Sequence, residues 1–516
     1  MDRNRVKSSI LNSSFASFSQ LINIIVKFIV QTFFIRTLGA LYLGTNGLFI
    51  NVLGVLSFFD LGINVAITFS LYQPLSNRDN ELINEIMAFF KKAYTVIGCL
   101  VLVIGLILVP FLPWMIKGTK IPFLQLCFII FLLNSVASYF FSYKISLLTA
   151  DQFGYQNSIN QTVFSLVQSM LQIIVLVVYR NFILYLVIQL ICTIASNLVI
   201  SLYIDKKYPF LKEKTKKNIP NDVLQKIKYN TLGMIGSKFG GIALNTSDNI
   251  VISAFVGIYY VGLYSNYLLI TNAVASLLSQ IVGSVSSSIG DFLVQHSKPL
   301  ERYRLFKRHL FVTFAFTYFC SILLACLLNP FITFWIGSKF TFPTFLVDLI
   351  VINFLLIEIR QSPITFITAA GLFNKVGIKS VIEALVNIGL SLVFVLVFHL
   401  GIEGVILGTI LSNIIINLWY EPLVVIKISI NLNKYSDVFI DYFTYIFSII
   451  IVMLMSQYII IRINYAGFFG LIIDFVVVLV FSGFLFIVFF HKKEEYKYTV
   501  QIIKNIFSRF NANRNN

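Results

Sequence analysis

The chain has 516 residues, of which 58% are hydrophobic and 12% are charged, and its mean hydropathy is +0.86. These values lie far from those of water-soluble domains, so the composition excludes a soluble globular protein and predicts a membrane protein. Lys and Arg outnumber Asp and Glu by 39 to 22, which gives a formal net charge of +17.

Apolar segments of roughly 20 residues, the length that crosses a bilayer as a helix, follow one another along the chain. We predict an all-α polytopic membrane protein with about fourteen transmembrane helices, and therefore with both termini on the same side of the membrane. The predicted helices are centred near residues 23, 56, 103, 134, 168, 192, 243, 276, 322, 355, 389, 415, 449 and 478.

The basic residues are distributed unevenly between the two sides of this predicted bundle. With the N-terminus inside, 30 Lys and Arg fall in the termini and inner loops, Lys144 and Lys379 among them, whereas 6 fall in outer loops. This is the positive-inside pattern, and it predicts that both termini are cytoplasmic. Topology therefore accounts for the positive charge, and we expect no nucleic-acid partner.

Short landmarks recur in the same order at an offset of about 220 residues. Residues 38–44 (LGALYLG) match 256–262 (VGIYYVG), Pro110-Phe111 and Trp114 match Pro330-Phe331 and Trp335, and Thr149-Ala150 match Thr368-Ala369. The constant offset predicts a duplicated unit of six helices. An even number of helices per unit makes the two repeats parallel, as in many transporters.

The repeat divides the chain into five predicted parts. These are an N-lobe of helices 1–6 (residues 1–204), a basic cytoplasmic linker (205–229), a C-lobe of helices 7–12 (230–428), two extra helices (429–491) and a cytoplasmic amphipathic and basic tail (492–516). Residues 77–92 and 494–510 carry apolar side chains at helical spacing among charges. We expect both segments to form helices on the inner membrane surface.

Polar side chains recur on one face of several predicted helices, at steps of three or four residues. The first helix carries Ser13, Ser17, Gln20, Asn23, Lys27 and Gln31; the second Asp60 and Asn64; the seventh Lys238, Asn245 and Asn249 with Asp248 at the flank; the eighth Asn272 and Ser276. Milder stripes occur on the fifth helix (Gln161, Ser165, Gln168, Gln172) and on the eleventh (Ser380, Glu383, Asn387, Ser391).

Eight charged residues are predicted to lie at membrane depth: Lys27, Asp60, Lys238, Asp248, Glu358, Arg360, Glu383 and Asp474. Each would cost roughly 2.5 to 3.5 kcal/mol if it faced lipid, so we expect them to face the protein interior or water. Interhelical bonds that hold a bundle together are one interpretation. A hydrated cavity between the lobes is the other, and the length of the polar faces favours it.

Nothing in the sequence indicates bound metal or catalysis. The five cysteines lie in apolar segments without CxxC spacing, the four histidines are far apart, and no nucleotide-binding motif is present. We expect no catalytic residue, no metal site and no cofactor other than a coupling proton or sodium ion.

Several stretches resemble the bacterial polysaccharide flippases, within the superfamily that includes the MATE multidrug exporters and the lipid II flippase. They are residues 34–39 (FIRTLG), 42–49 (YLGTNGLF), 61–63 (LGI), 71–75 (LYQPL), 148–152 (LTADQ), 245–250 (NTSDNI) and 262–267 (GLYSNY). The resemblance implies a MATE-like fold of two pseudo-symmetric six-helix lobes around a central cationic cavity, with two extra helices. It also implies that undecaprenyl-diphosphate-linked oligosaccharide moves from the cytoplasmic to the outer leaflet of the bacterial inner membrane for O-antigen, capsule or exopolysaccharide assembly.

That function assigns expected roles to the polar residues. Lys27, Lys238 and Arg360 would supply cations for the diphosphate, and Asn23, Asn64, Asn245, Asn249 and Asn272 would bond the glycan. Asp60, Asp248 and Glu383 would bind a coupling ion, or would pair with the same cations structurally. The expected partners are the lipid-linked oligosaccharide, the bilayer, the polymerase and other polysaccharide-assembly proteins.

Three alternatives share part of this pattern. A MATE-type cation-coupled multidrug exporter has the same architecture, and lipid II as cargo would present similar chemistry. A membrane enzyme of the polysaccharide pathway usually needs a large outer loop with catalytic residues, whereas the outer loops here are short. We therefore predict a transporter and not an enzyme.

Overall fold

The structure is a computed structural model, and its described residues are 3–60, 63–117, 121–213, 219, 224–225, 246–295, 298–432, 435–463 and 467–514. Over those ranges the chain is almost entirely helical and contains no β-strand. The all-α fold class predicted from the sequence is therefore confirmed.

Packing divides the chain into two compact units, Met1–Ser265 and Asn266–Asn516. The boundary between them falls inside helix α9, Ile258–Gly283. The boundaries of these units differ from those of the lobes and the linker predicted from the sequence repeat. The division into lobes and linker stays a prediction.

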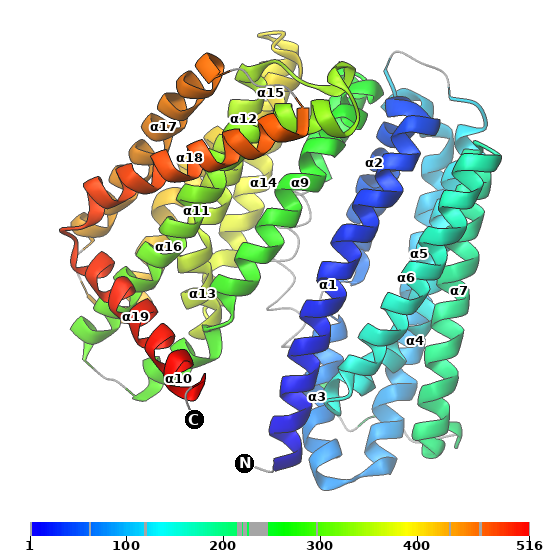
Figure 1. Ribbon diagram of the computed structural model, residues 1–516. Helices are drawn as coiled ribbons and strands as arrows, with labels where there is room; N and C mark the ends of the chain where they lie inside the picture. Colours follow the sequence, from blue (N-terminus) through cyan, green and yellow to red (C-terminus); the bar gives the residue numbers. More distant parts are fainter. Residues whose placement is uncertain are drawn as a thin grey trace. The chain divides into compact units, whose positions relative to one another are not determined.

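The first unit is a bundle in which α1 packs against α6, and α5 packs against both α4 and α7 (Figure 1). Its helices are α1 (Arg3–Thr37), α2 (Gly39–Leu56), α3 (Ile63–Asn77), α4 (Asn80–Leu108), α5 (Leu124–Ala150), α6 (Gly154–Val178) and α7 (Phe182–Lys207). Short helical turns are η1 (Ser57–Asp60), η2 (Val109–Met115), η3 (Pro209–Lys212) and the π-helical η4 (Ile252–Val256). The side chains of Asp79 and Asn181 cap α4 and α7 by accepting a hydrogen bond from the backbone NH of Leu82 and Leu184.

Within the first unit, α2 and the start of α9 cross with their backbones in contact. A Cβ atom on Gly44 would lie 2.9 Å from the backbone nitrogen of Gly262 and closer still to the carbonyl oxygen of Ile258. A Cβ atom on Gly262 would lie 2.7 Å from the carbonyl carbon of Ala40 and closer still to its oxygen. The two glycines occupy the same place in the two copies of the repeated landmark, so equivalent residues meet at this crossing.

The second unit is arranged around α11 (Pro299–Trp335), which packs against α12, α17, α18 and α19 (Figure 1). Its other helices are α10 (Ser286–Gln295), α12 (Thr344–Ile359), α13 (Gln361–Ala369), α14 (Phe373–Leu396), α15 (Gly401–Ser412), α16 (Leu418–Val424), α17 (Ser436–Ile463), α18 (Gly467–Phe490) and α19 (Glu494–Arg514). Shorter segments are η5 (Ser338–Phe340) and the π-helical η6 (Asn413–Asn417) and η7 (Val425–Ile430).

Among the described residues, 12 helices are long and apolar enough to cross a membrane. The predicted helix near residue 243 lies outside the described residues. The one predicted near residue 355 corresponds to α12, which has only 16 residues before the chain continues into α13. The chain is a multi-pass membrane protein.

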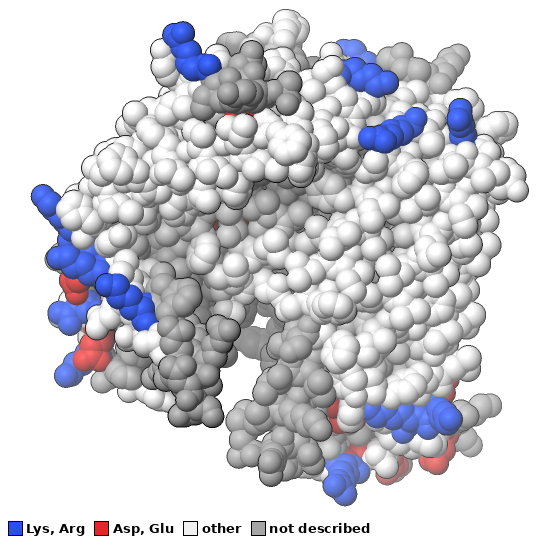
Figure 2. Space-filling model, in the orientation of Figure 1, with Lys and Arg blue, Asp and Glu red and all other residues white. Residues whose placement is uncertain are grey.

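The surface of the helices is apolar, as a lipid environment requires. Large apolar side chains are widely exposed, for example Phe469 on α18 at 79% and Ile461 on α17 at 73%. Water-soluble proteins rarely expose apolar area on this scale. On the face shown in Figure 2, the described charged side chains lie near the ends of the long helices and along α19, and the middle of the long apolar helices is white.

Two expectations about surface segments and loops are wrong. Residues 77–92 do not form a separate surface helix, because α4 runs without a break from Asn80 to Leu108 and its apolar residues Ile86 and Phe90 are buried. Lys144 and Lys379 are not loop residues. Lys144 lies in α5, where its Nζ is 2.6 Å from a carboxylate oxygen of Asp205.

The predicted amphipathic tail forms α19, which packs on α11 in the second unit. Lys307 of α11 lies 3.0 Å from a carboxylate oxygen of Asp441 in α17 and 3.2 Å from one of Glu495 in α19. Lys493 is 2.5 Å from the other carboxylate oxygen of Asp441. Alternating charges from three segments therefore fasten the start of the tail to the bundle.

Candidate functional site

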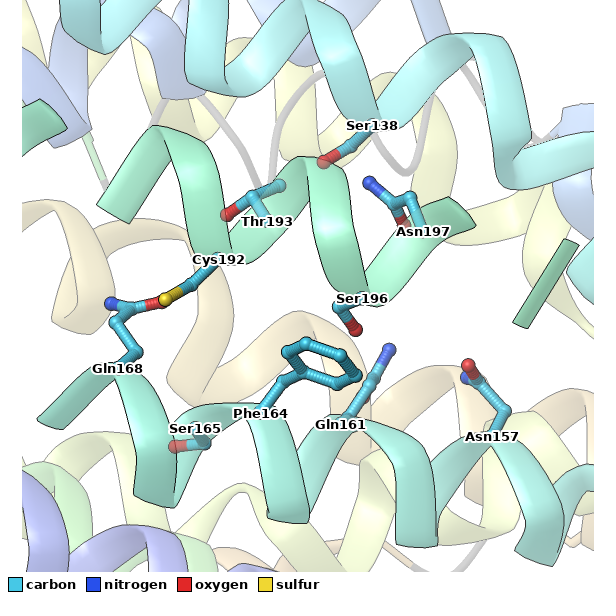
Figure 3. A pocket seen from close by; sticks show the side chains of 10 residues that line it. All are labelled: Ser138, Asn157, Gln161, Phe164, Ser165, Gln168, Cys192, Thr193, Ser196 and Asn197. Carbon is cyan, nitrogen blue, oxygen red and sulfur yellow. The ribbon is translucent and has the colours of Figure 1, made fainter. Parts of the chain in front are cut away.

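A polar cavity of about 200 Å³ lies among α5, α6 and α7 in the first unit (Figure 3). It is lined by Ser138 of α5, by Asn157, Gln161, Phe164, Ser165 and Gln168 of α6, and by Cys192, Thr193, Ser196 and Asn197 of α7. The α6 residues recur at steps of three or four, which places them on one face of the helix. The polar stripe predicted for residues 161–172 therefore faces the interior in part: Gln172 is buried, Ser165 and Gln168 are half-buried, and Gln161 is exposed.

The α6 stripe is joined to the polar face of the first helix. The hydroxyl of Ser165 donates a hydrogen bond of 2.9 Å to the side-chain oxygen of Asn23. Asn23, a predicted glycan ligand, thus lies at the edge of this cavity. A second bond, 2.9 Å from the Asn160 amide to the Ser196 hydroxyl, ties α6 to α7.

The lining of the cavity is polar but carries no charge. Its members are amides, hydroxyls, one thiol and one aromatic ring, and no Lys, Arg, Asp or Glu is among the lining residues. In Figure 3, Gln161 and Phe164 point from α6 towards α7, and Ser196 points from α7 towards α6. Such a lining can donate and accept hydrogen bonds with a neutral ligand but offers no counter-charge to an anion.

A cluster of four charges, three of them buried and Arg360 13% exposed, lies in the second unit. The guanidinium of Arg360 donates two hydrogen bonds, of 2.7 and 3.0 Å, to the two carboxylate oxygens of Glu421. Lys379 lies 2.8 Å from Glu421 and 3.0 Å from Glu383. Arg360 also lies 3.6 Å from Glu383, so each cation contacts both carboxylates.

Two asparagines complete this charged cluster, which we define as Arg360, Lys379, Glu383, Glu421, Asn413 and Asn417. Asn417 accepts a 2.6 Å hydrogen bond from Lys379 and donates to Glu383, while Asn413 accepts one from Arg360. Both asparagines belong to the π-helical segment η6. π-Helical turns are often found at functional sites.

The charged cluster has no net charge, and its carboxylates are almost inaccessible to solvent. Two cations face two carboxylates, and Glu383 and Glu421 are only 1% and 2% exposed. Buried charges are tolerated when they are paired and hydrogen-bonded, as these are. Arg360 and Glu383 were predicted to act at membrane depth, and the fold brings them together here. The guanidinium of Arg360 already binds a carboxylate through two bonds, so a diphosphate would have to compete with Glu421.

Sequence reasoning missed Lys379 and Glu421 as members of this cluster. Lys379 was assigned to a loop, and Glu421 was not counted at membrane depth. Lys379 and Glu383 are four residues apart, a spacing that pairs side chains on a helix and could have revealed the first half of the cluster. No comparable signal links Glu421 to either residue.

The remaining predicted site residues are placed as follows. Lys27 and Asn272 are exposed, Asp248 is half-buried, and Asn249 is buried. Asp60 and Asn64 lie in η1 and α3 with side chains outside the described part, and Lys238 and Asn245 lie outside the described residues altogether. Glu358 and Asp474 are buried, as expected of charges at membrane depth.

Comparison with solved structures shows a shared fold. The lipid II flippase MurJ in an inward closed conformation is 15% identical, with a TM-score of 0.66, and the match covers 93% of this chain and 99% of that chain. An inward-facing multidrug resistance MATE family transporter of the MOP superfamily is 14% identical, with a TM-score of 0.59, covering 85% of this chain and 98% of that chain. No curated protein sequence matches the chain significantly.

Comparison with models of protein families shows the family to which the sequence belongs. The family described as polysaccharide biosynthesis protein matches residues 10–286, a stretch that contains the whole lining of the polar cavity. The match extends over more than half of the 516 residues. The chain therefore belongs to the polysaccharide biosynthesis protein family.

Proposed function

We propose that this protein is a flippase that moves undecaprenyl-diphosphate-linked oligosaccharide repeat units from the cytoplasmic to the outer leaflet of the bacterial inner membrane. The product would serve O-antigen, capsule or exopolysaccharide assembly. The observation that carries the proposal is the family match over residues 10–286, which includes a neutral polar cavity within membrane-spanning helices. The positive-inside pattern supports cytoplasmic termini.

The chemistry of such a substrate divides into three parts. The oligosaccharide needs hydrogen bonds, the diphosphate needs cations, and the polyprenyl tail remains in lipid. Amide and hydroxyl side chains suit the first need, and Lys27, which is exposed on α1, suits the second. Lys238 is proposed as its partner from the polar stripe. The two lobes predicted from the repeat would alternate in access to the two sides of the membrane.

The energy for transport would come from a coupling ion that binds to carboxylates. Asp60, Asp248 and Glu383 are candidates for binding a proton or a sodium ion. In the charged cluster, a proton on Glu383 would leave the two cations facing one carboxylate, so protonation would change the balance of charge. Transport that is indifferent to both the pH gradient and the sodium gradient would exclude this role.

The decisive experiment is depletion of the protein in its native host, followed by mass spectrometry of lipid extracts. With polymerase and glycosyltransferases intact, a flippase predicts accumulation of a complete undecaprenyl-diphosphate oligosaccharide and loss of surface polysaccharide. An unchanged lipid pool with altered drug sensitivity would favour a multidrug exporter instead. Accumulated lipid II would identify the peptidoglycan precursor as cargo.

The role of the two lysines has its own test. If Lys27 and Lys238 contact the diphosphate, changing both to Gln should abolish surface polysaccharide while the protein still reaches the membrane. Normal export by the double variant would exclude the assignment.

A further inference from the structure

Two buried polar atoms at the polar cavity have no hydrogen-bond partner among the described residues. They are the side-chain oxygen of Asn157 on α6 and the side-chain nitrogen of Asn197 on α7, and both residues line the cavity. A buried polar group left without a partner costs about 1 to 3 kcal/mol. One is an acceptor and the other a donor, and both are sealed from solvent; rotation of the two amides towards the cavity would present both to a hydroxyl-bearing molecule.

The rest of the lining matches the same kind of molecule. The amides of Gln161 and Gln168 and the hydroxyls of Ser138, Thr193 and Ser196 all offer both donors and acceptors. Phe164 supplies one aromatic face, whose negative charge density favours the C–H bonds of a sugar ring. A phosphate or a carboxylate would find no cation in this lining.

The size of the cavity limits what it can hold. About 200 Å³ lies below the roughly 300 to 1,000 Å³ of pockets that enclose a whole drug-sized ligand. The cavity therefore suits a single ring, with the rest of a larger molecule outside it.

We propose that this cavity is a subsite for one neutral pyranose ring of the transported oligosaccharide, held by Asn157, Gln161, Asn197 and Phe164. The inference rests on the proposed function for the identity of the larger molecule, and it adds the class of ring and the residues that bind it. An uncharged hexose or N-acetylhexosamine fits the lining, whereas a uronic acid does not. The diphosphate is bound elsewhere.

The native thiol of Cys192 provides a direct probe, because it lies in the lining of the cavity. The other four cysteines are changed to Ala in the full-length protein, and the rate of modification of Cys192 by methyl methanethiosulfonate is measured in detergent. The probes are glucose, galactose, N-acetylglucosamine, glucuronate and inorganic pyrophosphate. At about three times its dissociation constant, a bound sugar should slow modification about fourfold, since the free fraction is then about one quarter.

Variants assign the effect to the cavity. Asn197→Leu should remove protection by the neutral sugars. Asn353→Leu is the matched control, because Asn353 also has a buried side-chain oxygen without a described partner but lies on α12 of the second unit. The same sugars should raise the thermal midpoint of the unmodified protein and not that of Asn197→Leu, which tests binding independently of the thiol.

The proposal is overturned if no neutral sugar slows modification or raises the midpoint, or if glucuronate or pyrophosphate is equally effective. Accumulation of lipid-linked oligosaccharide on depletion, without sugar protection of Cys192, would refute the subsite and leave the flippase function standing. Protection without accumulation would support the subsite and refute the flippase function.

Discussion

Replacement of Glu421 by Gln should destabilise the second unit strongly. The substitution keeps the shape of the side chain but removes the charge that receives two hydrogen bonds from Arg360 and a third contact from Lys379. The charged cluster then changes from balanced to a net charge of +1 in a site where Glu383 is 1% exposed.

The expected magnitude follows from the burial. Removing one partner of a buried ion pair typically costs about 3 to 5 kcal/mol, because the other charge is left uncompensated. The amide oxygen of Gln can still accept one hydrogen bond, so we expect the lower end, about 3 kcal/mol. Glu301→Gln is the matched control, since Glu301 is 41% exposed and lies 3.9 Å from Lys298, and it should change stability by less than about 0.5 kcal/mol.

Thermal unfolding of the purified variants in detergent would measure the effect. Adding Arg360→Met to Glu421→Gln restores the balance of charge around Lys379 and Glu383. The double variant should therefore be more stable than the sum of the two single changes predicts. A midpoint for Glu421→Gln equal to that of the wild type, or strictly additive effects, would refute the view that these charges form one coupled cluster.

Three further changes test other parts of the structure. Gly44→Ala should lower stability by about 3 kcal/mol, the upper end for overpacking, because backbone atoms of α9 cannot rotate away; Gly389→Ala, which lies within α14 and meets no atom within 4 Å, should raise stability by up to about 1 kcal/mol in the same unfolding assay. Asp441→Asn should release Lys493, next to the start of α19, from α17, seen as faster proteolysis of the tail, and unchanged proteolysis would contradict that anchoring. Asn23→Cys should react with a water-soluble maleimide, and complete protection would argue against a hydrated polar face on α1.

The class of protein and most of its helices could be predicted from the sequence alone. Runs of apolar residues with the length of a bilayer-spanning helix are local features, so they locate α5, α6, α7 and α11 without knowledge of the fold. The stripe at residues 161–172 was equally visible, because helical periodicity determines which residues share a face. The inward orientation of three of its four residues follows from the cost of exposing polar groups to lipid.

The positions of polar groups relative to one another were decided by the tertiary structure. Arg360 follows α12, Lys379 lies in α14 and Glu421 lies in α16, and no spacing in the sequence indicates that these three segments come together. The first turns of α4 likewise escaped prediction, although a spanning helix near residue 103 was expected, because their charged residues resemble a surface segment until their apolar neighbours are seen to be buried. Periodicity specifies which face of a helix is polar, whereas the partner of each polar group depends on contacts between residues far apart in the chain.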